Sequence, residues 1–171
     1  MNEPAPRRSL AIPGAAFLAV AAIVVALDQL TKVLIRSTIE RGDEWPEGWA
    51  VRLVHVTNSG AAFGVLEGQT LFLIVTSLIA IGTIAFYYLY PPADHAFVRV
   101  ALGLLLGGAI GNLMDRIRSG EVVDFVKFPN FPAFNVADSS ISIGVALLFI
   151  FSLLSEREEQ ARTGEQTSAE G

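Results

Sequence analysis

The sequence contains no cysteine and only two histidines among its 171 residues. Without cysteine, a thiol nucleophile, a disulfide framework and thiolate metal sites are all excluded. The two histidines form no HExxH arrangement, which leaves little for a zinc site. Chemistry in this chain must therefore come from Asp, Asn, Ser, Lys or Arg side chains.

Charged residues are also scarce: they make up 17% of the chain, against about 25% in an average soluble domain. Hydrophobic residues make up 52%, and the mean hydropathy is +0.51. The net charge of −5 argues against a nucleic-acid partner, because a surface that binds phosphates needs clustered Lys and Arg. An apolar excess of this size in so short a chain indicates a membrane protein.

Four segments are apolar enough to cross a membrane, which takes roughly 20 residues. The first two carry no charge from Ser9 to Leu27 and from Gly68 to Ala93. The third is interrupted only by Arg99, and the fourth continues uncharged after Asp138. We therefore expect an all-α membrane protein, a four-helix transmembrane bundle forming one domain over residues 1–155, with spans at about 10–30, 68–90, 96–115 and 136–155.

A cleavable signal peptide is the alternative interpretation of the first run, which follows Arg7 and Arg8. The run is long for the apolar part of a signal peptide and leads directly into polar residues from Asp28 onward, which favours a spanning helix. Within the third span, two overlapping Gly-xxx-Gly spacings between residues 103 and 111 predict the close approach of another helix.

The segments outside the spans differ in character. Residues of about 40–67 include the alternating strand-like Val51–Val56 and the turn signal Asn58-Ser-Gly, so we expect a small extramembrane β segment between spans one and two. The tail at 156–171 is polar and low in aromatic residues, which predicts a disordered segment.

In an up-down-up-down bundle, the ends of spans one and three share a membrane face with the starts of spans two and four. That face collects the polar residues that are unusual near a membrane, namely Asp28, Lys32, Asn58, Asn112, Asp115, Asp124, Asn135 and Asp138. Ionisable residues at membrane depth are costly and usually face a bundle interior or a water-filled cavity. This face is therefore the predicted functional site.

Asn-x-x-Asp occurs twice in this set, from Asn112 to Asp115 and from Asn135 to Asp138, and this spacing puts both members on one side of a helix. Structural roles are open for three of these groups: an Asp28–Lys32 ion pair, a salt bridge of Asp115 with Arg116 or Arg118, and a helix N-cap at Asn135.

Asp124 and Asp138 are the hardest to explain as surface residues. Asp124 lies within the strand-like apolar segment Val122–Val126, and Asp138 lies in the first turn of an apolar helix. Two aspartates held close together cannot both ionise easily, so they share a proton. One can then activate water while the other donates to a carbonyl oxygen, which cleaves an amide without cysteine, serine or metal.

Other functions remain open at this point. A small four-span ion or proton transporter would use the buried carboxylates as a relay, although their position at one end of the bundle disfavours a path across it. A Ser-Lys protease would combine Ser139 or Ser140 with Lys32 or Lys127. A structural scaffold would tolerate substitution of all these residues.

The sequence around the polar residues resembles the motif blocks of bacterial lipoprotein signal peptidase, also called signal peptidase II. In order, the blocks are Asp28-Gln-Leu-Thr-Lys32, Asn58-Ser-Gly-Ala-Ala-Phe63-Gly, Gly107-Gly-Ala-Ile-Gly-Asn112-Leu-Met-Asp115-Arg116, Val122-Val-Asp124-Phe and Phe134-Asn135-Val-Ala-Asp138-Ser. The match covers about residues 10–155. Each block alone would be weak evidence for the family, but the complete set in this order is highly specific for it.

This resemblance implies a monomeric aspartic endopeptidase of the bacterial inner membrane, with both termini cytoplasmic and the active site near the periplasmic face. It implies partners that are prolipoproteins with a lipidated cysteine, cut just before that cysteine, and membrane lipids. It implies no metal and no organic cofactor, and a periplasmic cradle over the substrate from Trp45 to Glu67. The implied site has Asp124 and Asp138 as the catalytic dyad, Asn58, Asn112, Asp115, Arg116 and Asn135 around it, and Asp28 and Lys32 as structural support.

The implied orientation reverses the positive-inside rule. The cytoplasmic side would carry five basic residues: Arg7, Arg8, Arg99, Arg157 and Arg162. The outer side would carry seven: Lys32, Arg36, Arg41, Arg52, Arg116, Arg118 and Lys127. The orientation therefore depends on the resemblance.

Overall fold

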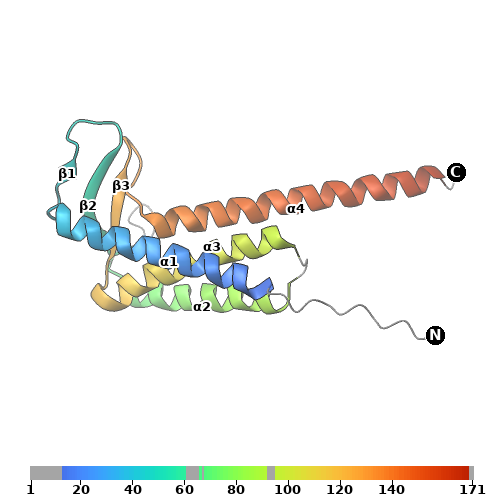
Figure 1. The fold of residues 1–171 in the computed structure, drawn as a ribbon, viewed down its shortest axis with the longest axis horizontal. Coiled ribbons are helices and arrows are strands. Elements are labelled where there is room, and N and C mark those ends of the chain that lie inside the picture. Colours follow the sequence, from blue (N-terminus) through green and yellow to red (C-terminus); the bar gives the residue numbers. More distant parts are fainter. Residues whose placement is uncertain (1–12, 61–65, 67, 92–94, 170–171) are drawn as a thin grey trace.

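Four long helices account for most of the fold, and a three-stranded sheet lies at one end of them (Figure 1). The computed structural model describes residues 13–60, 66, 68–91 and 95–169. In chain order the elements are α1 (Pro13–Thr38), β1 (Glu44–Trp45), β2 (Arg52–Asn58), α2 (Thr70–Leu89), α3 (Ala96–Ser119), β3 (Val122–Lys127) and α4 (Val136–Ala169). All four helices are long and apolar enough to cross a membrane, so the predicted four-helix architecture is confirmed.

Helix α3 lies at the centre of the bundle, with α1, α2 and α4 packed against it. Glycines on α3 allow this close packing: a Cβ at Gly107 would lie 2.6 Å from the Cβ of Val24 on α1. A Cβ at Gly111 would lie 2.6 Å from Oδ2 of Asp28, so this glycine makes room for a carboxylate. The predicted close approach is confirmed. The packing of α1 into the bundle also supports a spanning helix over a cleaved signal peptide.

The sheet has the order β1-β2-β3 and is antiparallel throughout. The strands predicted at 51–56 and 122–126 are confirmed as β2 and β3. The sheet is not confined to the region between the first two spans, because β3 comes from between α3 and α4. Val56 of β2 is opposite Asp124 of β3, which fixes Asp124 beside the end of β2.

Two local features turn the chain from α3 into β3 and then into α4. Gly120 is the C-cap of α3: its φ of 78° is left-handed, and its N–H donates to the carbonyl of Arg116. Buried Val123 and Phe125 of β3 then pack against Ile35 of α1. These contacts anchor the sheet to the bundle at the level where Asp124 lies.

Two predicted boundaries are wrong. Helix α1 continues to Thr38, beyond the expected end near residue 30, because Lys32 one turn later neutralises Asp28 and the helix need not stop at that charge. Helix α4 continues to Ala169, so the tail predicted to be disordered is helical through this residue. Its many Glu, Arg, Gln and Ala residues are good helix formers. Arg7, Arg8 and residues 61–64 of the Asn58 block lie outside the described residues.

Candidate active site

A buried ion cluster joins α1 to α3. The ammonium of Lys32 lies 2.8 Å from Oδ2 of Asp28 and 2.9 Å from Oδ2 of Asp115, and all three side chains are fully buried. Arg36, which is part-exposed, lies 3.2 Å from the other oxygen of Asp115. Two cations thus balance two carboxylates, which is what burial of charge requires.

The Asp28–Lys32 ion pair is therefore confirmed, and so is a salt bridge for Asp115, but with different partners than predicted. Asp115 pairs with Lys32 and Arg36 of α1 and not with its sequence neighbours. Arg118 instead donates to the side chain of Gln29. Arg116 directly follows Asp115 and points in another direction, whereas Arg118 has a spacing that would allow contact but bonds to α1 instead.

Asp28 also holds the start of α4. Its Oδ1 accepts a 3.0 Å hydrogen bond from the backbone N–H of Ala137. The first N–H groups of a helix have no partner within the helix, so an acceptor from another helix stabilises this end. Sequence reasoning missed this contact, which joins residues 109 positions apart. The ion cluster thereby sets the position of the helix that carries Asp138.

Asn112 connects the ion cluster to Asp138. Its Oδ1 accepts from Lys32 at 3.0 Å and from the side-chain amide of Asn135 at 3.2 Å. Its Nδ2 donates to Oδ1 of Asp138 at 2.7 Å. Because Lys32 can only donate, the amide of Asn112 has one favourable orientation, with its NH₂ group toward the aspartate. A fixed donor therefore faces the Asp138 carboxylate.

Asn135 contacts both predicted catalytic aspartates. Its Oδ1 accepts from the backbone N–H of Asp138 at 2.9 Å, and its own backbone N–H donates to Oδ2 of Asp138 at 3.2 Å. This reciprocal pair is a capping box, so the predicted N-cap is confirmed. The side-chain amide of Asn135 also donates to Oδ1 of Asp124 at 2.7 Å. A single residue thus sets the position of one aspartate on β3 and one on α4.

Asp124 is buried and accepts hydrogen bonds on both oxygens. Asn135 donates to Oδ1, and Asn58, at the end of β2, donates to Oδ2 at 3.2 Å. Burial raises the pKa of Asp124 to about 7, helped by the nearby charge of Asp138 and opposed by the two asparagine hydrogen bonds. Near neutral pH, protonated and ionised forms of Asp124 are therefore both available.

Both aspartates line one cavity of about 690 Å³. Asn58, Asn112 and Arg116 also line it, and its apolar wall comes from the segment before α4 and from the first turns of α4. Arg116 donates to the carbonyl of Gly60 at 3.2 Å, which holds the chain just after Asn58. The structure thus brings all nine predicted site residues into one network or onto the wall of this cavity.

Two further observations bear on other chemistry. Among residues 13–60, 66, 68–91 and 95–169, no group of three or more His, Cys, Asp or Glu side chains is arranged to hold a metal. The hydroxyls of Ser139 and Ser140 donate to the backbone carbonyls of Asn135 and Val136, and Lys127 donates to the carbonyl of Phe131. With Lys32 committed to the ion cluster, the geometry does not support a Ser-Lys protease.

Solved structures with the same fold are bacterial membrane enzymes. One, determined by the in meso method, has a TM-score of 0.79 and 35% identity, covering 85% of this chain and 91% of the other. A second has a TM-score of 0.75 and 35% identity, covering 81% of this chain and 93% of the other. The four apolar helices and this likeness define a multi-pass bacterial membrane enzyme.

The sequence comparisons give the family. A family model described as signal peptidase (SPase) II matches residues 20–154. The lipoprotein signal peptidase of Shouchella clausii is 43% identical over 146 residues, which are 84% of this chain and 97% of that protein. That of Halalkalibacterium halodurans is 48% identical over 146 residues, which are 81% of this chain and 92% of that protein. The chain belongs to the signal peptidase II family of aspartic peptidases, as its motif blocks predicted.

Proposed function

We propose that the protein removes the signal peptide from diacylglyceryl-modified prolipoproteins, cutting just before the lipidated cysteine, with Asp124 and Asp138 as the catalytic dyad. The relatives that match over nearly their whole length are lipoprotein signal peptidases, which supports this substrate class. The main support for assigning these two aspartates as the dyad is that Asn135 contacts both of them. It donates to Asp124 through its side chain and to Asp138 through its backbone N–H.

In the proposed reaction the dyad shares one proton. The ionised carboxylate accepts a proton from water, whose oxygen attacks the scissile carbonyl carbon, while the protonated carboxyl donates to the carbonyl oxygen. The tetrahedral intermediate then returns a hydroxyl proton to the dyad as its C–N bond breaks, and the leaving amine takes a proton from the dyad, which is left with one shared proton as at the start. Near neutral pH, a raised pKa for Asp124 keeps a carboxyl proton available for this cycle.

The surrounding residues keep the dyad in place without adding charge. Asn58, Asn112 and Asn135 donate hydrogen bonds to the two carboxyl groups. Such neutral donors fix orientation while leaving the shared proton to the aspartates. Arg116, which lines the same cavity, is suited to hold the chain around Gly60 over a bound peptide.

We further propose that the sheet and the dyad face the periplasm and that the ends of the chain are cytoplasmic. The start of α1 and the end of α4 both lie at the end of the bundle away from the sheet (Figure 1). A lipidated cysteine stays at the membrane surface, so a cavity at the sheet end of the spans suits this substrate. The exposed Trp45 and Trp49, near the sheet, are suited to a membrane interface.

The transporter alternative lacks a relay. Helix α2 carries no charged residue, and α3 carries none between Arg99 and Asp115. Helix α4 carries none between Asp138 and Glu156. A proton or ion crossing the bundle would therefore find no ionisable partner on these helices over most of their length.

Incubation of the purified protein with a diacylglyceryl-modified prolipoprotein in detergent tests the proposed activity. Mass spectrometry should identify a product that begins with the lipidated cysteine and a released signal peptide. The same substrate with an unmodified cysteine should be cleaved poorly. Cleavage at another bond, or equal cleavage of both substrates, would contradict the proposal.

A further inference from the structure

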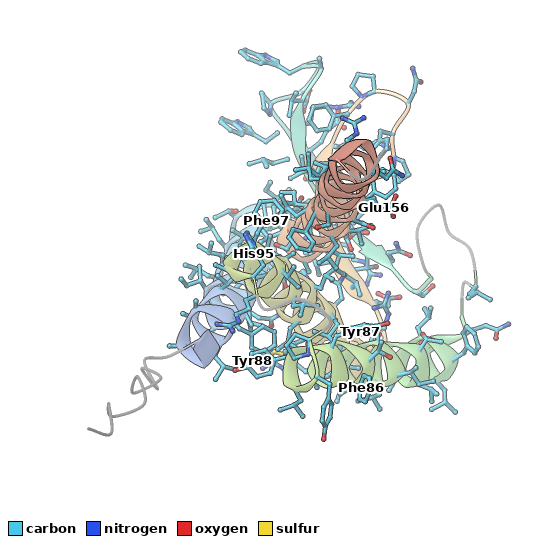
Figure 2. The ribbon with its side chains drawn as sticks, turned by 90° about the vertical axis from the view of Figure 1, so that its right-hand side faces the viewer. Phe86, Tyr87, Tyr88, His95, Phe97 and Glu156 are labelled. Atoms are coloured by element: carbon cyan, nitrogen blue, oxygen red, sulfur yellow. The ribbon has the colours of Figure 1, made fainter. Side chains whose placement is uncertain are left out.

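A second cavity of about 540 Å³ lies at the end of the bundle away from the sheet. Three helices line this cavity. They contribute Ile84 and Tyr87 of α2, Leu102 and Leu105 of α3, and Phe151 and Glu156 of α4. Figure 2 looks at this end and shows Tyr87 and Glu156 on helices that lie on either side of α3. The walls are mostly apolar, and Glu156 is the one carboxylate among the described residues that line them.

One face of α3 lines both cavities. Val98, Leu102 and Leu105 line the second cavity, and Asn112 and Arg116 line the catalytic cavity. Their spacings of four, three, seven and four residues keep them on the same side of an α-helix. The two cavities therefore lie in line along one face of α3, and we refer to this face together with both cavities as the groove.

One face of α4 also links the two cavities. Asp138 lines the catalytic cavity, and Glu156 lines the second. The 18 residues between these positions are about five helical turns, so the two carboxylates project from the same side of the helix. At 1.5 Å per residue they are separated by about 27 Å along the axis.

We propose that this groove holds the membrane-spanning part of the substrate's signal peptide, with Glu156 binding a cationic side chain near the peptide's N-terminus. The inference rests on the proposed function and adds a second binding site to it. A signal peptide has a positively charged N-terminal region, an apolar region of about 7–15 residues and a cleavage site with small residues. These three regions follow one another in the same order as the parts of the groove. The basic region corresponds to Glu156, the apolar region to the apolar wall, and the cleavage site to the dyad.

The lengths also match. An apolar region of about 12 residues in a helix spans about 18 Å, and about three extended residues before the cleavage site span about 10 Å more. A peptide whose scissile bond is at the dyad therefore puts its basic region close to Glu156. The distance between Glu156 and the dyad would therefore favour signal peptides of matching length.

Charge distinguishes this occupant from a lipid. Glu156 is exposed, and its one described hydrogen bond is a weak one of 3.4 Å from Ser152. A carboxylate in that state attracts Lys or Arg and repels the phosphate of a phospholipid headgroup. The groove is therefore better matched to a basic peptide than to an anionic lipid.

Steady-state kinetics of the full chain in detergent test the inference with two substitutions. Glu156→Lys should raise KM about tenfold for a substrate with Lys in its N-terminal region, because attraction becomes repulsion. A substrate with Glu in place of that Lys should recover most of the loss. Ser152→Trp should also raise KM by filling the groove, whereas Ile150→Trp, on the opposite side of α4, should not.

A shortened substrate without the basic region provides the readout that separates binding from chemistry. Wild type and Glu156→Lys should cleave it with the same kcat and KM. Normal wild-type cleavage with unchanged KM in both groove variants would overturn the inference and leave the proposed function intact. Loss of co-purified phospholipid from Ser152→Trp, with KM unchanged, would also overturn it by identifying a lipid site. A wild type that cleaves no prolipoprotein would overturn the proposed function itself.

Discussion

The side-chain amide of Asn135 donates a 2.7 Å hydrogen bond to Oδ1 of Asp124, from a residue that is also the N-cap of the helix carrying Asp138. The two contacts use different atoms of the same side chain. Oδ1 caps the helix, and Nδ2 holds the aspartate on β3. A structural role and a role at the dyad can therefore be separated by substitution.

Asn135→Ser should keep the cap and lose the amide donor, because serine is an equally good N-cap residue. We expect a melting temperature near that of the wild type and a kcat lowered by about 10- to 100-fold, since the lost bond is made to a carboxyl group that must be positioned. Asn135→Ala should lose the same activity and about 1 kcal/mol of stability as well. Thermal unfolding and cleavage kinetics on both variants check this. Full activity in Asn135→Ser would contradict the role at the dyad.

Lys32→Met should destabilise the protein strongly. The substitution leaves Asp28 and Asp115 buried without their central cation, at a cost of about 3–5 kcal/mol. Arg36→Met is the matched control, because this part-exposed partner of Asp115 should cost only about 0–1 kcal/mol. Denaturation in mixed detergent micelles compares the two. Equal effects would show that burial of the ion cluster does not determine its contribution.

Titration of Asp124 should contribute to the pH dependence of the protein's stability. Its pKa is raised in the folded protein from 3.8 to about 7, so the folded state favours the protonated carboxyl. The stabilisation is complete at low pH and is lost as the pH rises through about 7. Asp124→Asn, which is never charged, should therefore gain in melting temperature relative to the wild type as the pH rises from about 4 to about 7. The fluorescence of Trp45 and Trp49 can follow unfolding of both proteins at each pH. Parallel curves of melting temperature against pH for the wild type and the variant would contradict the raised pKa.

Cysteine labelling tests the proposed orientation, because the chain has no cysteine of its own. Ala50→Cys lies on the exposed loop before β2, and Arg157→Cys lies at the C-terminal end of the candidate span in α4. In intact spheroplasts, a membrane-impermeant maleimide should label the first variant, and it should label the second only after permeabilisation. The reverse pattern would show that the positive-inside rule, which the proposed orientation violates, holds after all.

The helices and the grouping of the polar residues could be predicted because they follow from periodicity and chain order. Apolar runs of about 20 residues predicted the spans, and alternation of the spans predicted which ends share a face. Asn135 as an N-cap and Asp28 with Lys32 as an ion pair are local contacts within one turn, so their spacing was enough.

Individual contacts between distant segments could not be predicted from the sequence. The pairing of Asp115 with Lys32, and the bond from Ala137 to Asp28, depend on how helices pack and not on spacing. Likewise, β3 completes a sheet that began before α2, since strand pairing joins segments far apart in the chain. The helical tail was missed because low hydrophobicity indicates no packed core but does not prevent a helix of good helix formers.

Cleavage of a diacylglyceryl-modified prolipoprotein by Asp124→Asn and Asp138→Asn is the most direct test of the account. A gel shift in detergent should show activity reduced by about 1,000-fold or more in each, because either change removes the shared proton or its acceptor. Thermal unfolding should show that both variants remain folded. Ser140→Ala, which loses only a bond to a backbone carbonyl, should keep wild-type activity. Near wild-type cleavage by either aspartate variant would contradict the dyad.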